Sequence, residues 1–229
     1  MTKISDKGLL FAHSNDANPV QSTFRQHMHN EYEMLYFIAG DADYVVGSSV
    51  YHLRPNDLLF IRPATYHYLK LLSAAPYERF IVNFPEDIVP KNISGLLGGY
   101  RELYNIPKTP DSPIDHIFYG LLQAAENFSQ KDARLALIQE INLVLLYLKY
   151  ASYQGGQPQK RHDVLDNILK FIDENLTSPL NAQVIAEKFY VSSSWISHTF
   201  GDFFAIGASP YITRQKLLYA QQLIKPRVP

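Results

Sequence analysis

Hydrophobic and polar positions alternate along the first third of the chain. Between residues 24 and 84, β-branched and aromatic residues alternate with polar ones, and Gly, Pro or Asn-Asp breaks separate the runs. Alternation with a period of two residues predicts strands, and several short strands in close succession predict a barrel or a sandwich. The predicted strands span residues 33–38, 43–46, 49–53, 57–61, 67–71 and 80–84.

From about Ser94 the spacing becomes helical. Residues 133–150 carry apolar side chains on nearly every side, as expected of a helix that packs against more than one neighbour. Residues 153–159 have the composition of a flexible linker. Four amphipathic helices are predicted after it, at 163–174, 181–189, 193–203 and 210–224. The pattern predicts an α+β chain with a β-barrel at 1–90, a helical segment at 91–153, a linker at 154–162 and an all-α domain at 163–229.

Composition narrows the class of protein. The 229 residues include no cysteine, which excludes disulfides and thiolate zinc sites, so a metal would need His and carboxylate ligands. The densest apolar run, 143–149, is too short to span a bilayer, and the first residues lack the apolar core of a signal peptide. We therefore expect a cytoplasmic protein without a membrane partner. The net charge is −3 over residues 1–159 and +2 over 160–229, which permits DNA binding by the C-terminal part.

A first motif lies at the start of the strand-rich region. His27, His29, Glu33 and Gly40 follow the spacing HxH(x)3E(x)6G, and a second segment, 54–67, ends in His67. Because side chains alternate faces along a strand, residues 27, 29 and 33 can point together into a barrel. Three imidazoles and one carboxylate could hold a divalent transition metal with open positions. Residues 24–84 are similar to the cupin superfamily, whose metal ligands would fall on His27, His29, Glu33 and His67.

A second motif, at residues 180–200, has the pattern of a helix, a tight turn and a second helix. Ser192 is a good N-cap for the second helix, and Ala186 is small where the two helices would cross. The expected buried face consists of Ile185, Phe189, Ile196 and Phe200.

This stretch and its flanking helices resemble the first half of the AraC-family DNA-binding domain over about sixty residues. The matching positions are Ile185-Ala186, Ser192, Ile196-Ser197, Phe200, Tyr211-Ile212, Ala220 and Leu223. The resemblance implies that Ser194, Ser197 and His198 face the bases and that Ser193 and Trp195 lie near phosphates. It also implies that the second helix-turn-helix unit is missing beyond residue 224, so we expect weak DNA binding.

The same resemblance changes the interpretation of the first motif. AraC-type sensor domains commonly keep the cupin pattern for turns, internal hydrogen bonds or effector contacts. We accordingly expect no cofactor and a small polar effector, such as a sugar or related metabolite, with a divalent metal on the four cupin positions as the alternative. The expected effector-binding residues are Arg25, His27, His29, Glu33, Tyr36 and His67. Asn56 stands where the cupin pattern usually has Gly, and Asp57 is expected to brace that turn.

These features predict a homodimeric, effector-responsive transcriptional regulator rather than an enzyme. Apolar residues at three- and four-residue steps suit an antiparallel helix pair between two copies, although the same residues could pack on the barrel of their own chain. They are Leu135, Ile138, Ile141, Leu145 and Leu148. Two alternatives remain: a metal-dependent cupin enzyme, which would have no use for a helix-turn-helix, and a truncated regulator that acts through heterodimerisation rather than DNA binding.

Overall fold

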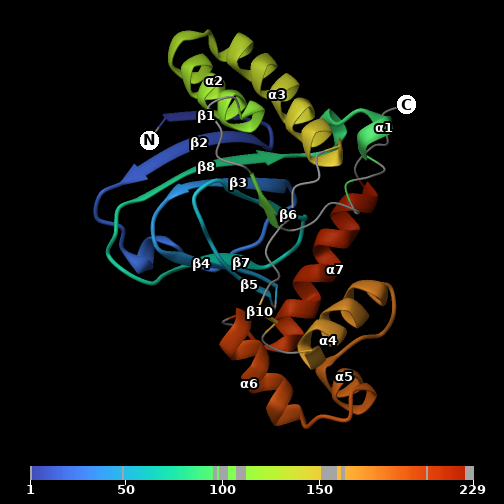
Figure 1. The fold of residues 1–229 in the computed structure, drawn as a ribbon. Helices are drawn as coiled ribbons and strands as arrows, with labels where there is room; N and C mark the ends of the chain where they lie inside the picture. Colours follow the sequence, from blue (N-terminus) through green and yellow to red (C-terminus); the bar gives the residue numbers. More distant parts are fainter. Residues whose placement is uncertain are drawn as a thin grey trace.

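The computed structural model describes residues 2–47, 49–94, 97, 103–106, 112–150, 159–160, 163–204 and 206–224. A sheet-rich N-terminal part lies between two helical layers (Figure 1). Helices α2 (Pro113–Asn127) and α3 (Gln130–Tyr150) cover one side, and the C-terminal helices lie on the opposite side. The α+β class is confirmed. In the described part of the chain, no helix is long and apolar enough to cross a membrane.

Two antiparallel sheets form the N-terminal part. The six-stranded sheet has the order β1 (Thr2–Asp6), β2 (Leu9–Asp16), β8 (Tyr77–Phe84), β3 (Tyr32–Ala39), β6 (Asp57–Ile61) and β9 (Leu103–Asn105). The four-stranded sheet has the order β10 (Gln159–Lys160), β5 (Ser49–His52), β4 (Ala42–Val46) and β7 (His67–Leu71). Short helical turns with described bounds also belong to this part, at η1 (Gln21–Thr23), η2 (Glu86–Ile88) and α1 (Lys91–Ser94).

The alternation along β3 divides its side chains between two cores. Leu35 and Phe37 pack with Tyr44 and Leu69 of the four-stranded sheet, so the two sheets face each other. Met34 and Tyr36 point to the other side of the six-stranded sheet, where α2 and α3 bury it. The cupin-like barrel is therefore built as two facing sheets, and among the described residues no ladder of strand pairs closes them into one.

The structure confirms the six predicted strands and adds four others. β1 and β2 extend the large sheet beyond β8, and β9 pairs with the edge of β6 although its segment was predicted to be helical. A three-residue strand has no periodicity of its own and exists because its partner strand holds it. Most of the predicted linker, residues 154–158 and 161–162, lies outside the described residues, whereas residues 159 and 160 form β10 against β5.

The turn before β6 has the predicted brace. The Arg54 amide donates to the Asp57 carboxylate at 2.8 Å. Asn56 has a φ of +71°, the left-handed region that glycine occupies without strain and that Asn tolerates. The Asn56 amide donates to the Phe37 carbonyl at 2.8 Å, which ties the turn to β3.

The C-terminal part contains four helices at the predicted places: α4 (Asp163–Glu174), α5 (Ala182–Lys188), α6 (Ser193–Phe204) and α7 (Ala208–Ile224). Asn181 caps α5 by accepting from the Val184 amide, and Ser192 caps α6 by accepting from the Trp195 amide. The predicted apolar face is buried at Ile185, Ile196 and Phe200, with Phe189 partly buried beside it. The helix-turn-helix geometry is thus confirmed for α5 and α6.

Candidate functional site

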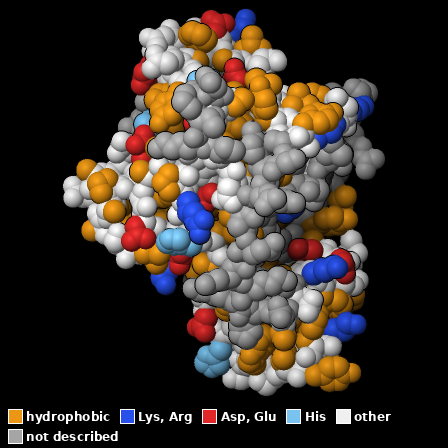
Figure 2. All heavy atoms as spheres, in the orientation of Figure 1, with side chains coloured by type: hydrophobic (Ala, Val, Ile, Leu, Met, Phe, Trp, Pro, Cys, Tyr) orange, Lys and Arg blue, Asp and Glu red, His pale blue; other side chains and the backbone are white. Residues whose placement is uncertain are grey.

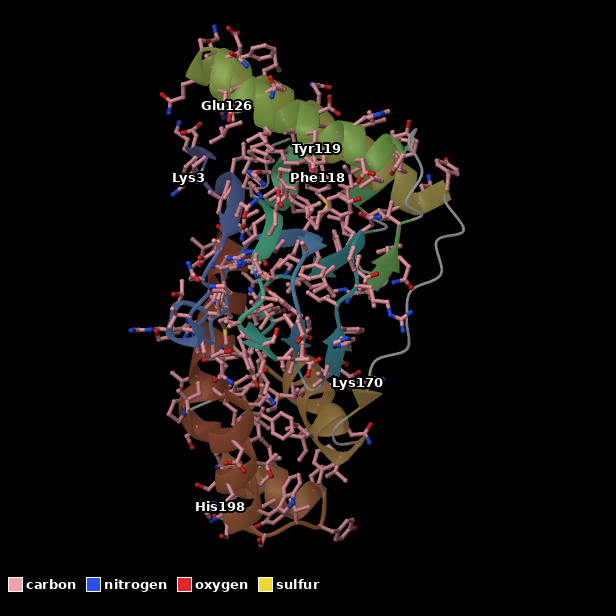
Figure 3. All side chains as sticks on the ribbon, turned by 60° about the vertical axis from the view of Figure 1, so that its left-hand side comes forward. Lys3, Phe118, Tyr119, Glu126, Lys170 and His198 are labelled. Carbon is pink, nitrogen blue, oxygen red and sulfur yellow. The ribbon has the colours of Figure 1, made fainter. Side chains whose placement is uncertain are left out.

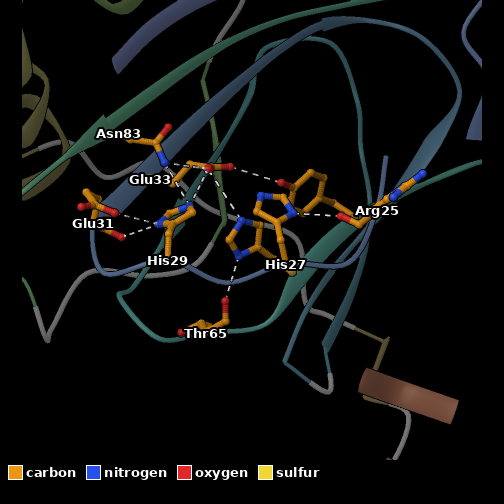
Figure 4. Close-up of polar contacts among 9 residues, drawn as sticks. Arg25, His27, His29, Glu31, Glu33, Thr65 and Asn83 are labelled. Atoms are coloured by element: carbon orange, nitrogen blue, oxygen red, sulfur yellow. Dashed lines mark hydrogen bonds and ion pairs between the residues drawn. The ribbon is translucent and has the colours of Figure 1, made fainter. Parts of the chain in front are cut away.

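Four potential metal ligands converge between the two sheets. Glu33 lies on β3, His67 begins β7, and His27 and His29 come from the extended segment before β3. One ligand atom from each lies within 4.8 Å of the other three (Figure 4). Backbone hydrogen bonds between His27 and His67, in both directions, hold the two segments together. We call these four residues the histidine cluster.

Each imidazole of the histidine cluster is anchored through Nδ1 to a main-chain carbonyl. His27 Nδ1 lies 2.9 Å from the Arg25 oxygen, His29 Nδ1 3.0 Å from the Glu31 oxygen, and His67 Nδ1 2.8 Å from the Thr65 oxygen. A carbonyl oxygen only accepts hydrogen bonds, so each Nδ1 carries a hydrogen. In a neutral ring the lone pair is then on Nε2, as required of a metal ligand whose second nitrogen is oriented by a hydrogen bond.

Glu33 is the buried acidic centre of the cluster. Its Oε2 lies 3.0 Å from His29 Nε2 and 3.7 Å from His67 Nε2, and its Oε1 accepts from the Tyr44 hydroxyl at 3.2 Å. Burial raises the pKa of Glu33, but the hydrogen bond with His29 and the proximity of His67 outweigh it and hold this pKa well below its ordinary value. Burial lowers the pKa of His29, yet its contact with Glu33 leaves that pKa raised overall. The site therefore holds a carboxylate at neutral pH.

Two polar neighbours of Glu33 were not among the predicted site residues. Asn83 stands directly opposite Glu33 in the β3–β8 ladder, with its amide nitrogen 3.0 Å from His29 Nε2 and 3.2 Å from Glu33 Oε2. Tyr44 reaches Glu33 from the opposite sheet. In the sequence, Asn83 is notable only as a polar residue between Val82 and Phe84 in a predicted strand. The pairing register of β3 and β8 is needed to show that Asn83 faces Glu33.

The side chains of two predicted effector-binding residues do not reach the histidine cluster. Arg25 is exposed and contributes its carbonyl to His27, while its side chain points away in Figure 4. Tyr36 is fully buried on the far face of β3, where its hydroxyl bonds to Asp115 and its ring stacks on Phe118 at 4.8 Å. Because Tyr36 is an odd number of residues from Glu33, strand alternation places the two on opposite faces.

The residues predicted to contact DNA share the first two turns of α6. Ser193, Ser194, Ser197 and His198 are exposed, while Trp195 is partly buried against the apolar core of the helical part. His198 lies at the end of the molecule farthest from α3 (Figure 3). The polar face of α6 is thus exposed, as is required of a recognition helix that enters a DNA groove.

The sequence profile of one family, described as "AraC-like ligand binding domain", matches residues 15–142. This match covers more than half of the chain. The chain belongs to the family of AraC-like ligand-binding domains. The matched residues contain the whole histidine cluster, all of α2 and most of α3. They also contain both sheets apart from β1, β10 and most of β2.

Two curated relatives of this AraC-like chain are HTH-type transcriptional regulators by name. "Uncharacterized HTH-type transcriptional regulator YfiF" of Bacillus subtilis (strain 168) is 25% identical over 214 residues, which are 87% of this chain and 66% of that relative. "Uncharacterized HTH-type transcriptional regulator YijO" of Escherichia coli (strain K12) is 34% identical over 62 residues, 27% of this chain and 22% of that relative. The chain therefore spans less than two thirds of either relative. Among solved structures, the AraC-like transcriptional activator CuxR has a TM-score of 0.46 and 15% identity, and the match covers 93% of this chain and 77% of that one.

The cluster of this AraC-like domain fits a divalent metal ion. His67 Nε2 is buried without a hydrogen-bond partner in the described structure, at a point where Glu33 Oε2 is its nearest acidic neighbour. A proton on His29 would satisfy Glu33 but leave His67 Nε2 unpaired, whereas a cation between them would satisfy both. The four ligand atoms lie within 4.8 Å of one another, and ligands roughly 2.0–2.2 Å from one ion lie at most about 4.4 Å apart, so the four groups have to move closer together to bind one ion.

Proposed function

We propose that this chain is the sensor and a DNA-binding unit of a ligand-responsive transcriptional regulator that acts in the cytoplasm. One observation carries the proposal: an AraC-like ligand-binding domain with a built polar site is joined to a helix-turn-helix whose α6 leaves its polar face exposed. The names of the curated relatives support a regulatory rather than a catalytic role.

We infer that the histidine cluster is the effector site and that a divalent transition metal occupies it. His27, His29, Glu33 and His67 would hold the ion, which would supply a Lewis-acidic centre for oxygen or nitrogen atoms of a small polar effector. Tyr44 and Asn83 position Glu33 and His29. His27 is the one exposed member of the cluster, so an effector would approach past its ring.

Elemental analysis of the purified chain tests the metal. We expect about one equivalent of a transition metal, lost in His67→Ala and kept in His52→Ala, because His52 lies on β5 outside the cluster and pairs with Asp43. Metal content that does not depend on His67 would contradict the assignment. Thermal-shift screening of small polar metabolites against the same two variants then tests effector binding, since a ligand that binds only the folded state raises the melting temperature.

Gel-shift titration at two salt concentrations tests the DNA-binding part. Ser194→Ala and His198→Ala should reduce discrimination between DNA sequences, because small polar side chains on α6 are the candidates for base contacts. Lys170→Ala is a matched control on α4, where this exposed lysine lies near Glu174. Equal discrimination by all four proteins would contradict the role of α6.

We also propose that two copies associate through the outer face of α3. Leu135 and Leu143 are exposed there, and Figure 2 shows hydrophobic side chains gathered over α2 and α3. Pairing two DNA-binding units in this way multiplies weak contacts to paired DNA half-sites.

A further inference from the structure

The two segments that carry the histidines also carry the contact with the helix-turn-helix. His27 and His29 point into the site, and the residues between and before them point the other way. The Gln26 side-chain nitrogen donates to the Phe203 carbonyl of α6 at 2.8 Å, and Met28 is buried in the apolar core of the C-terminal helices. Neighbouring residues of an extended chain face opposite sides, so one short segment serves both the site and the docked helices.

The segment that leads into His67 has the same arrangement. The Thr65 carbonyl anchors the His67 ring, whereas Tyr66 packs against both Phe204 and Tyr211, with ring centroids 5.3 Å and 5.5 Å away. The carbonyl of Ala64, the residue before Thr65, accepts a hydrogen bond from the Gln215 side chain at 2.8 Å. Ala64 and Tyr66 thus contact the helical part, while Thr65 and His67 belong to the site.

Helix α7 makes the matching contacts from the other side. Gln215 is buried, with 3% of its surface exposed, and Arg214 lies over the Tyr66 ring with a guanidinium nitrogen 3.3 Å from its hydroxyl. Gly47, directly after β4, donates its amide to the Tyr66 carbonyl at 2.7 Å, which fixes Tyr66 to the barrel. A shift of the His67 backbone would therefore move a side chain that is packed among α6 and α7.

The interface is not fully packed. A pocket of about 230 Å³ lies between the Pro63–Tyr66 stretch and the faces of α4 and α7, and Tyr66, Tyr211 and Gln215 are among the residues that line it. Close-packed cores resist rearrangement, whereas an interface with open space can take a second arrangement at lower cost. The contact between the two parts can thus respond to a change in the site.

We propose that metal occupancy of the histidine cluster and docking of the helix-turn-helix on the barrel are thermodynamically coupled through residues 26–29 and 64–67. This proposal rests on the metal site proposed above. In the docked arrangement the four ligands are already assembled, so metal binding favours docking, and docking favours metal binding by the same factor. Occupancy of the site would then set the position of α6, whose C-terminal end is held by Gln26 while its N-terminal turns remain exposed.

Zinc titration of the full chain against a competing chromophoric chelator tests the coupling. Gln215→Ala removes a contact on α7 that touches no member of the histidine cluster, so an effect on zinc affinity has to travel through the interface. We expect a loss of zinc affinity of about 5- to 50-fold, within the usual range of coupling between sites. Arg214 is exposed, so Arg214→Ala should leave the fold intact and cause a smaller loss in the same direction.

Lys216→Ala is the matched control. Lys216 follows Gln215 on α7, but its ammonium donates to the Ser178 carbonyl within the helical part and does not touch the barrel. Its zinc affinity should stay within about twofold of the wild type. As a second measurement, hydrogen exchange over residues 208–224 should slow when zinc is added to the wild type and to Lys216→Ala, and respond less in Gln215→Ala.

The outcomes separate the two proposals. Zinc binding that depends on His67, together with unchanged affinity in Gln215→Ala and unchanged exchange in α7, would overturn the coupling and leave the metal site standing. No zinc binding by the wild type would overturn the metal site, and with it the coupling. Weaker binding in Gln215→Ala and Arg214→Ala but not in Lys216→Ala supports both.

Discussion

At the scale of single residues, the site depends on which face of a strand a side chain occupies. Glu33 and Tyr36 are three positions apart on β3, and only Glu33 faces the opposite sheet. Tyr44 reaches Glu33 from that opposite sheet, although it was not among the predicted site residues. Tyr44 therefore belongs to the site, whereas Tyr36 belongs to the packing between the sheet and the helices.

Replacing each tyrosine by phenylalanine should have opposite consequences. Tyr44→Phe removes the donor to Glu33 Oε1 and should lower metal affinity by about tenfold, as loss of a partner behind a ligand typically does. Tyr36→Phe should leave metal affinity unchanged and lower the free energy of unfolding by about 1–2 kcal/mol, because Asp115 loses its partner. Metal titration and urea unfolding of both variants measure this. Equal losses of metal affinity would show that Tyr36 also acts on the site.

The left-handed turn at Asn56 gives a second prediction at this scale. Asn56→Ala should lower the free energy of unfolding by about 1–2 kcal/mol, because a Cβ-bearing residue without a local side-chain hydrogen bond is strained at a φ of +71°. Asn56→Gly should change the free energy of unfolding by less than about half of the loss expected for Asn56→Ala, since glycine occupies this region freely. Urea unfolding decides between them, and a glycine variant less stable than the alanine variant would refute the backbone argument.

At the scale of elements, α6 is specified by its own first residues. Ser192 supplies the cap, and Ile196 and Phe200 supply the buried stripe one and two turns later. The serines that follow the cap are exposed and have no part in that core. Helix stability and the proposed DNA contact therefore depend on adjacent serines.

Adjacent serine variants should separate these two properties. Ser192→Ala should lower the free energy of unfolding by about 1 kcal/mol, the usual cost of a lost N-cap. Ser193→Ala should leave stability within about 0.5 kcal/mol of the wild type and weaken DNA binding, because Ser193 is exposed on the proposed recognition helix. Urea unfolding and gel shifts measure the two quantities. A Ser193→Ala variant as unstable as Ser192→Ala would place the cap one residue later.

At the scale of the whole molecule, α3 packs one face against its own chain and leaves hydrophobic side chains exposed on another face. Three residues of the predicted dimer seam, Ile141, Leu145 and Leu148, are buried against the sheet of their own chain. Leu135 is 57% exposed and Leu143 40% exposed, and helical spacing places both on the side of α3 away from that buried stripe. The alternative in which α3 packs on its own barrel therefore holds for those three residues, and an interface with a second copy would use Leu135 and Leu143.

A charge at Leu143 should test the dimer without damage to the fold. Leu143→Asp should convert a dimer to a monomer in sedimentation at micromolar concentration and leave the melting temperature nearly unchanged, because Leu143 is exposed in one chain. Leu145→Asp should instead unfold the N-terminal part, since a carboxylate would replace a fully buried side chain. A Leu143→Asp variant that still sediments as a dimer would place the interface elsewhere.

Local patterns along the sequence were enough to predict most of the elements and the four residues of the histidine cluster. Strand alternation, helix capping and helical spacing are local properties, so six strands and the helix-turn-helix were predicted close to their observed limits. The spacing of His27, His29 and Glu33 likewise fixed their common direction. The same alternation could have excluded Tyr36 from the site. Tyr36 is three residues from Glu33, and residues an odd number apart on a strand lie on opposite faces.

What these elements face depends on the tertiary structure. β9 exists because β6 offers it an edge, and Asn83 joins the site because the β3–β8 register sets it opposite Glu33. Met28 and Tyr66 alternate with the histidines in the sequence, yet nothing local indicates that α6 and α7 cover them. Pairing register and packing join residues far apart along the chain, and their energies depend on the whole set of contacts rather than on any local pattern.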